Sequence, residues 1–314
     1  MAALAEPLAG NAPHRPTWVL IEHPGPWGRD AVLDAAWPAQ LGADFGARLQ
    51  KVLDDAGLRV VLARRSGRTG QAEADGRPIE PGRRVVLART GGCGWAAATT
   101  LAGAADLLDL PWTDLLEGHT PPYLAAPGHW HDPGPVWAVC TQGTRDACCA
   151  RLGRPIAAAL QSATDQSGAG QVWEISHSGG HRFAGVVLEL PEGVLYGRVG
   201  EADVPALVAA RAAGAVVPQL MRGQVHRSPG VQAGEATLRE RLSEPSLTAL
   251  QLLDEVTTAG AAASTSTSTG VWRHEPSGTV WTVRAEERPL DPRPVSCGKP
   301  AEAGTCWVVT DVSR

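Results

Sequence analysis

The stretch QVWEISHSGGHRFAGVVLELPEGVLYGRV, residues 171–199, contains the pattern that decides the fold. Its first six residues read as a strand, and residues 183–199 alternate around the turn sequence PEG, which predicts a β-hairpin. Between these β elements stand His177 and His181, four residues apart around a Gly-Gly pair. The two histidines therefore need an explanation, either as part of a polar turn or as part of a site.

The segments on either side extend this pattern into a larger unit. Residues 134–149, GPVWAVCTQGTRDACC, read as a strand that enters a polar loop. A helix is expected over 154–163, with Pro155 in its first turn, and another over 203–214, ending at Gly214. Strand, helix, strand, hairpin and helix is the element order of the thioredoxin fold.

The first half of the chain repeats this order. Residues 16–30 predict a strand followed by a Pro/Gly loop, and residues 41–57 predict an amphipathic helix. Strands are expected at 58–65 and 83–90, joined as a hairpin with a long loop. The segment VLIEHPGPWGRD thus corresponds in position to WAVCTQGTRDAC in the second unit. We therefore predict an α/β protein with two thioredoxin-like units in tandem, which arose by internal duplication. The first copy has no cysteine in its loop, so we expect it to scaffold the second.

The expected domains are 1–125, 126–235 and 236–314, the last a small extension of a helix and strands. Its helix follows residue 235 and is interrupted at Pro245, and the low-complexity segment 261–270 reads as a flexible linker. Short strands at 270–275, 279–287 and 306–312 are expected to form a small sheet. Residues 6–13 and 120–135 read as irregular connectors.

Composition excludes several classes of function. The chain has 314 residues, 43% hydrophobic content and a net charge of −5, which gives no sign of nucleic-acid affinity. No apolar run approaches about 20 residues, and the N-terminus has no basic region followed by a long apolar one. We therefore expect a cytoplasmic protein without nucleic-acid or membrane partners.

The second copy gathers five candidate soft ligands: Cys140, Cys148, Cys149, His177 and His181. Loops that follow neighbouring parallel strands emerge at one edge of a sheet, so these side chains can meet. Thiolates with imidazoles select zinc, copper or iron–sulfur clusters. Structural zinc sites use C-x(2–4)-C, whereas the C-x8-C of Cys140 and Cys149 suits a larger cluster. Two thiolates and two imidazoles are the Rieske set of a 2Fe–2S cluster.

Two alternatives stay open at this point. One is a structural zinc protein without redox function. The other is a thioredoxin-like thiol oxidoreductase that uses Cys148 and Cys149 or another pair, although the chain contains no C-x-x-C.

Other chemistry-bearing residues receive simpler interpretations. Cys297 and Cys306 form a second C-x8-C without paired histidines, which indicates coincidence or an oxidation-sensitive pair, and Cys93 is a lone thiol. Arg145 and Asp146 are expected to form a loop-fixing ion pair, and Arg182 to tune the site electrostatically. The remaining histidines of interest lie in a Pro-rich connector and are expected to be exposed: His119, His129 and His131.

The combination of CTQGTRDACC with SHSGGHRFAGVVLELPEGVLYGRV resembles the sucrase/ferredoxin-like family of thioredoxin-like ferredoxins, and EPLAGNAP, HPGPWG and RPVSCG also resemble its bacterial members. The resemblance implies a 2Fe–2S cluster bound by Cys140, Cys149, His177 and His181. Gly179 and Gly180 would let the backbone pass close to the cluster and donate amides to its sulfide. No paired-carboxylate signature of sugar hydrolysis is found. We expect an electron carrier rather than an enzyme, with a flavin reductase or another oxidoreductase as its redox partner.

Overall fold

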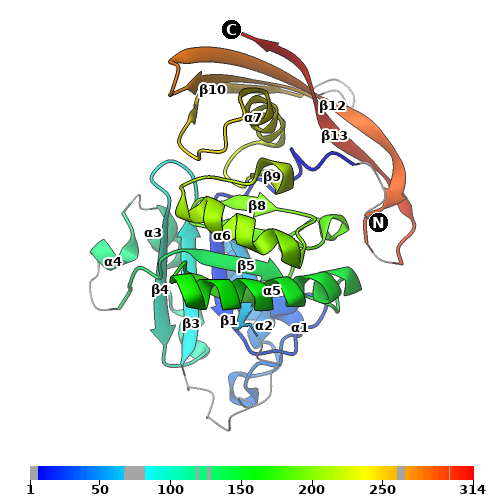
Figure 1. Cartoon of the computed structure of the whole chain (residues 1–314). Coiled ribbons are helices and arrows are strands. Elements are labelled where there is room, and N and C mark those ends of the chain that lie inside the picture. Colours follow the sequence, from blue (N-terminus) through cyan, green and yellow to red (C-terminus); the bar gives the residue numbers. More distant parts are fainter. Residues whose placement is uncertain (1–5, 67–81, 118–119, 126–128, 260–265, 297) are drawn as a thin grey trace. The chain divides into compact units, whose positions relative to one another are not determined.

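The computed structural model describes residues 6–66, 82–117, 120–125, 129–259, 266–296 and 298–314 (Figure 1). The chain divides into two compact units. The central unit contains residues 15–178 and 187–193. The terminal unit contains the described residues up to 14, residues 179–186 and residues from 194 onward, so both ends of the chain belong to it.

The central unit is built on one mixed sheet with strand order β4-β3-β1-β2-β6-β5-β7. Strands β1 and β2 are parallel, as are β5 and β6, and the other neighbouring pairs are antiparallel. The strands are β1 Thr17–Glu22, β2 Arg59–Arg65, β3 Arg83–Arg89, β4 Trp95–Leu101, β5 Val136–Cys140, β6 Gln171–Ile175 and β7 Val187–Leu190. The helices are α1 Ala31–Asp34, α2 Phe45–Asp55, α3 Trp112–Glu117, α4 Pro122–Ala125 and α5 Ala147–Ser167.

Strand β1 explains why this sheet is covered on both faces. Val19 and Ile21 pack in one cluster with Phe45, Leu49 and Leu53 of α2, at the helical spacing that the sequence predicts. The alternate residues of β1 point to the opposite face, where Trp18 and Leu20 are also buried. An α/β arrangement is therefore confirmed.

The expected hairpin of residues 58–65 and 83–90 is wrong. Both strands exist, but β1 lies between them, parallel to β2 and antiparallel to β3. A strand that is buried on both faces needs hydrogen-bonded neighbours on both edges, and β2 and β3 supply them. Strand β4, which extends the sheet beyond β3, was not predicted.

The register of the sheet brings the two parallel pairs together at their carboxyl ends. Glu22 pairs with Ala63, Ala63 with Ile175, and Ile175 with Cys140, so one row crosses four strands. Strands β2 and β6 are antiparallel and overlap only over residues 63–65 and 173–175. The loop after β1 and the loop after β5 therefore emerge beside each other.

The terminal unit combines a short strand pair with a separate four-stranded sheet of order β10-β11-β12-β13, all antiparallel. In Figure 1 this sheet curves around α7, whose Val231 and Leu238 pack against Trp272 and Trp281. Its elements are β8 Val194–Tyr196, α6 Val204–Ala212, β9 Met221–Gln224, α7 Pro229–Leu242, β10 Leu250–Thr258, β11 Thr267–His274, β12 Thr279–Pro294 and β13 Ala301–Ser313.

Two expectations for this region need correction. The helix begins at Pro229 and ends at Leu242, and the residues after Pro245 form β10 rather than more helix. Leu250 and Leu252, two residues apart, pack against the α7 cluster, which is strand periodicity. Residues 267–270 of the expected linker belong to β11, and residues 261–265 lie outside the described part. The small C-terminal sheet and helix α6 are confirmed.

Within the described ranges, no helix is long and apolar enough to cross a membrane.

Candidate functional site

The cysteine loop, residues 141–146, joins the end of β5 to the start of α5. Helix α5 begins at Ala147, seven residues earlier than predicted, so Pro155 lies inside it and Cys148 and Cys149 stand in its first turn. Asp146 caps the helix by accepting a hydrogen bond from the Cys148 N–H at 2.9 Å.

Cys140 is the point where three predicted ligands of the central unit meet. Its thiol is hydrogen-bonded to the Cys149 side chain, to the His177 side chain and to the backbone of Ser178. These bonds, that from Cys149 foremost, hold the pKa of Cys140 well below its usual range, although burial opposes the shift. Both thiols are buried, each 2% exposed. Two cysteines and one histidine thus form one group at the carboxyl end of β5 and β6.

The adjacent residues Cys148 and Cys149 differ in their bonding. Cys148 is disulfide-bonded, whereas Cys149 is a free thiol next to Cys140. Cys306 is free and buried, and Cys93 is free and exposed. Cys297 lies outside the described residues, so the second C-x8-C has no structural test.

Gly179, Gly180 and His181 belong to the terminal unit. Both glycines have positive φ, +100° and +73°, which other residues rarely adopt. His181 begins a short 3₁₀ turn that ends at Phe183. Of the four predicted ligands, the structure therefore brings together Cys140, Cys149 and His177, which lie in the central unit. His181 lies in the other unit.

Arg182 has a defined partner that the sequence did not indicate. Its Nε donates to both carboxylate oxygens of Glu6 at 2.8 and 2.9 Å, and its Nη2 donates to Asn11. Arg198 donates to the Glu6 carbonyl at 2.8 Å. The sequence predicts an irregular connector at residues 6–13. In the structure this N-terminal segment is bonded to residues that follow the histidines.

The loop after β1 holds the cysteine loop in place. Gln142 Nε2 donates to the carbonyls of Gly28 at 2.7 Å and Arg29 at 3.1 Å, and the Thr144 hydroxyl lies 3.0 Å from the carbonyls of Trp27 and Gly28. The predicted Arg145–Asp146 pair is wrong. Arg145 pairs with Asp30 at 3.1 Å, because Asp146 turns inward to cap α5.

A buried ion pair next to the thiols was also missed. Glu174 Oε2 accepts from Arg64 Nη2 at 2.7 Å and from the hydroxyl of Thr141, the residue after Cys140, at 3.0 Å. The Arg64 guanidinium also lies 4.5 Å from the centre of a Trp27 ring. The available signal was a carboxylate within the otherwise apolar strand VWEI, which needs a buried partner.

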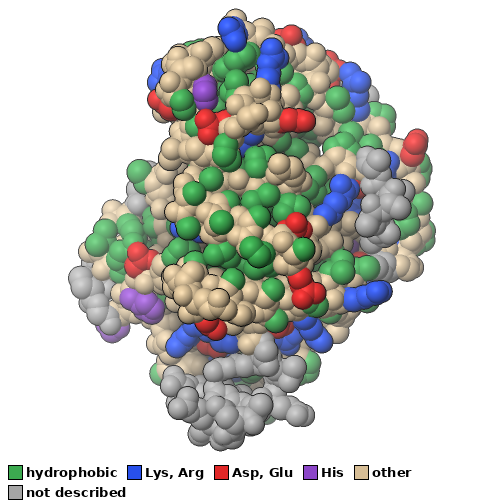
Figure 2. All heavy atoms as spheres, in the orientation of Figure 1, with side chains coloured by type: hydrophobic (Ala, Val, Ile, Leu, Met, Phe, Trp, Pro, Cys, Tyr) green, Lys and Arg blue, Asp and Glu red, His purple; other side chains and the backbone are tan. Residues whose placement is uncertain are grey.

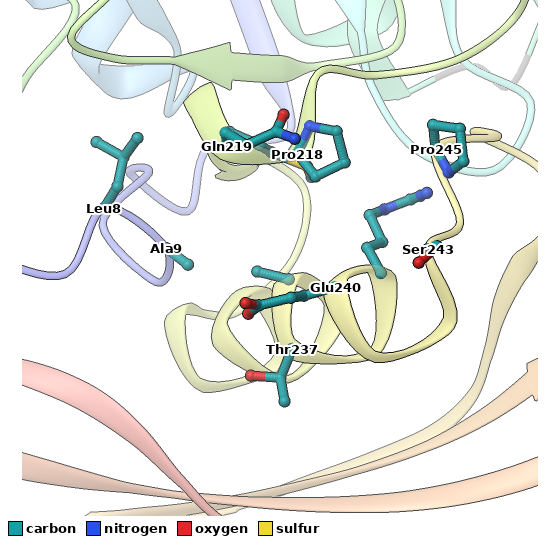
Figure 3. Close-up of a pocket in the computed structure, with 11 residues that line it drawn as sticks. Leu8, Ala9, Pro218, Gln219, Thr237, Glu240, Ser243 and Pro245 are labelled. Atoms are coloured by element: carbon teal, nitrogen blue, oxygen red, sulfur yellow. The ribbon is translucent and has the colours of Figure 1, made fainter.

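Other candidates lie away from this group. His129 and His131 are exposed, as expected, and His119 is outside the described residues. A pocket of about 600 Å³ in the terminal unit is lined by Leu8, Gln219, Glu240 and neighbouring residues and contains none of the predicted ligands (Figure 3). Among the described residues, no group of three or more His, Cys, Asp or Glu side chains, the group around Cys140 included, is arranged to hold a metal ion.

The molecule is thus an α/β protein in which neighbouring parallel strands end at a group of two buried thiols and a partly buried imidazole. The chain belongs to the sucrase/ferredoxin-like family, whose model matches residues 8–223. That range includes both parallel strand pairs and ends in β9. The resemblance seen in the sequence is therefore confirmed.

Among solved structures, the chain is similar to a thioredoxin-like [2Fe–2S] ferredoxin from Aquifex aeolicus, at 21% identity and a TM-score of 0.26 over 28% of this chain and 89% of that one. The Cys55Ser variant of the Aquifex aeolicus ferredoxin matches at 23% identity and a TM-score of 0.25 over 28% and 96% of the two chains. No curated protein sequence matches.

Proposed function

We propose that this protein carries electrons through one 2Fe–2S cluster bound by Cys140, Cys149, His177 and His181. The observation that carries the proposal is the hydrogen-bonded group of Cys140, Cys149 and His177, formed by residues from two strand ends and a helix start. Membership of the sucrase/ferredoxin-like family supports it. When bound, the cluster supplies one-electron redox chemistry.

The residue types in the proposed donor set are those of a Rieske-type cluster. Thiolates are the form that binds iron, and the lowered pKa of Cys140 favours thiolate at that residue. In a Rieske-type centre each iron takes only two protein ligands, two thiolates on one and two imidazoles on the other. Four residues separate His177 from His181, a span of at most about 14 Å of chain, which lets both rings reach one iron.

We further propose that the central sheet contains a duplicated thioredoxin-like unit. The orders β2-β1-β3 and β6-β5-β7 agree in sequence order and in strand direction, which supports this reading. The first copy would then serve as the scaffold whose loop, residues 23–30, binds the cysteine loop of the second.

The proposed partner is a redox protein that docks weakly, in the cytoplasm. In Figure 2 hydrophobic and uncharged atoms dominate the area over α5, with charged side chains toward its edges. Leu152 in α5, three residues after Cys149, is 44% exposed. Weak electron-transfer contacts bury small areas, so a partly apolar surface with charged edges would suit a transient contact.

Iron and acid-labile sulfide, measured with the visible spectrum of aerobically purified protein, test the proposal. We expect a red-brown protein with about two irons and two sulfides per chain, the content of one 2Fe–2S cluster. A colourless protein with stoichiometric zinc would support the structural zinc alternative and refute the proposal. Clearly more iron would mean that the first copy or the C-terminal cysteines hold a second cluster.

A thiol oxidoreductase is the second candidate, because Cys140 and Cys149 are already in hydrogen-bond contact. Two thiols so placed can form a disulfide and release two electrons to an acceptor disulfide. A colourless, metal-free protein that exchanges thiols with a disulfide substrate would favour this candidate.

A further inference from the structure

Arg222 connects three segments of the terminal unit. It lies in β9 and is 2% exposed. Its Nη1 donates to the Gly179 carbonyl at 3.0 Å, and its Nη2 donates to the Asn11 carbonyl. Its own carbonyl accepts from the Gly10 N–H at 3.0 Å. One side chain thus joins the N-terminal segment to the residues that directly precede His181.

Gly180 makes room for this guanidinium. A Cβ at position 180 would lie 2.3 Å from Nη2 and 2.9 Å from Nη1 of Arg222, closer than real carbon contacts allow. The loop can therefore lie flat against the guanidinium only because residue 180 is glycine. The positive φ of Gly180 gives a second, independent reason for glycine there.

The end of the same turn is held by stacking. Three guanidinium carbons surround the Phe183 ring: Arg182 at 4.6 Å, Arg222 at 4.9 Å and Arg198 at 5.3 Å from its centre. Phe183 is itself fully buried. Cation–π contacts with a desolvated ring are stronger than those at the surface. His181 therefore lies between two points, Gly179 and Phe183, that Arg222 contacts.

We propose that Arg222 is the positioning residue of the His181 side of the site, fixing the backbone of Gly179 and Gly180 so that the imidazole is presented for metal binding. The part of this inference that makes His181 a metal ligand rests on the proposed function. The anchoring of the loop by Arg222 rests on the contacts alone. Residues that orient ligands in this way typically change metal affinity about 10–100-fold when replaced.

The test uses the full chain as purified, with Arg222→Met, Arg222→Lys and Gly180→Ala. The control is Arg241→Met, which removes an exposed guanidinium of the same unit that stacks on Trp281 at 5.1 Å. Three quantities are measured: the rate of iron release to a chelator, the visible spectrum, and hydrogen exchange of residues 177–183. A thermal unfolding curve for each variant checks that it folds.

We expect iron release about tenfold faster or more in Arg222→Met, with an altered spectrum and faster exchange in the loop. Arg222→Lys should also release iron faster, since an ammonium lacks the planar fork that reaches two carbonyls. Gly180→Ala keeps the charge but displaces the loop, and it should behave like Arg222→Met. Arg241→Met should match the wild type.

Wild-type iron release in both Arg222→Met and Gly180→Ala would overturn the proposal. Full rescue by Arg222→Lys would also overturn it, because charge rather than geometry would then be the cause. If Arg222→Met does not fold, Gly180→Ala decides. If the wild type binds no iron, the proposed function fails instead. Unchanged hydrogen exchange in Arg222→Met would separately show that Arg222 does not fix the backbone of Gly179 and Gly180.

Discussion

At the scale of single residues, the site depends on a choice between neighbours. Cys148 and Cys149 are adjacent in the sequence, but only Cys149 bonds to Cys140. The C-x8-C spacing predicts Cys149 as the ligand. Successive residues in a helical turn point about 100° apart, so the side chains of Cys148 and Cys149 face different surroundings.

The first prediction tests this choice. Cys140→Ser and Cys149→Ser each remove a thiolate and should lose the cluster, seen as loss of iron and of visible absorption. Cys148→Ser removes a disulfide-bonded neighbour and should keep its iron. Retention in Cys149→Ser together with loss in Cys148→Ser would show that the neighbour is the ligand.

A second prediction concerns His23, which follows β1 and is 2% exposed. Its Nε2 donates to the Ala36 carbonyl at 3.3 Å, and its Nδ1 accepts from the Gly25 N–H at 3.1 Å, so a neutral ring satisfies both contacts. Burial, with the charge of Arg83, lowers the pKa of His23 to about 4.

Because the folded pKa lies below the unfolded value of about 6.5, the unfolded chain takes up a proton first as pH falls. His23 should therefore contribute a decrease in the free energy of unfolding between pH about 6.5 and about 4, of on the order of 3 kcal/mol at most. Denaturant titrations across this range should show a shallower dependence in His23→Gln and an unchanged one in His129→Gln, an exposed histidine. Equal slopes in all three proteins would contradict this assignment.

At the scale of elements, helix α5 lies unusually close to the strand that carries Cys140. A Cβ on Gly153 would stand 2.3 Å from the Cys140 carbonyl oxygen. Replacing glycine by alanine inside a helix ordinarily stabilises by about 1 kcal/mol. Here we predict the opposite sign, because the added methyl forces the helix away from β5.

Gly153→Ala should lower the free energy of unfolding by about 1–3 kcal/mol and disturb the cysteine site. Ala158→Gly, at an exposed position of the same helix, should cost only about 1 kcal/mol and leave iron binding intact. Guanidinium unfolding and iron content of the two variants provide the comparison. A stabilised Gly153→Ala protein would contradict the packing described here.

The periodicity of apolar residues predicted the helices and strands that bury one face. It did not predict strand pairing or hydrogen bonds between residues that are far apart in the sequence. The amphipathic helix at 45–55 and the strands near 17–22, 59–65 and 171–175 agree with the structure. The insertion of β1 between β2 and β3 depends on non-local pairing, which no local pattern contains. Likewise, the C-x8-C and H-x3-H spacing identified the ligand candidates. Local spacing could not identify Arg222, Gln142 or Glu174, because their hydrogen-bond partners lie between 33 and more than 200 positions away in the sequence.

At the scale of the whole molecule, the loop after β1 is hydrogen-bonded to the cysteine loop after β5 and supports the candidate site there. Gln142 is the clearest link, because it is buried and binds two carbonyls of the loop after β1. Gln142→Leu should lower the free energy of unfolding by about 1–3 kcal/mol, since both carbonyls lose a buried donor. Gln161→Leu breaks only a surface pair with Asp165 and should change stability by less than about 0.5 kcal/mol. Equal unfolding free energies for the two variants would show that the loops are independent.

The central claim is that two thiolates and two imidazoles hold one cluster, and its midpoint reduction potential at neutral pH tests it most directly. An imidazole ligand is neutral where a thiolate is negative, so mixed ligation favours the reduced state. We predict a potential clearly above roughly −400 mV, the value for plant-type ferredoxins, and a lower potential in His177→Cys and His181→Cys. A potential near roughly −400 mV that neither substitution changes would contradict the account.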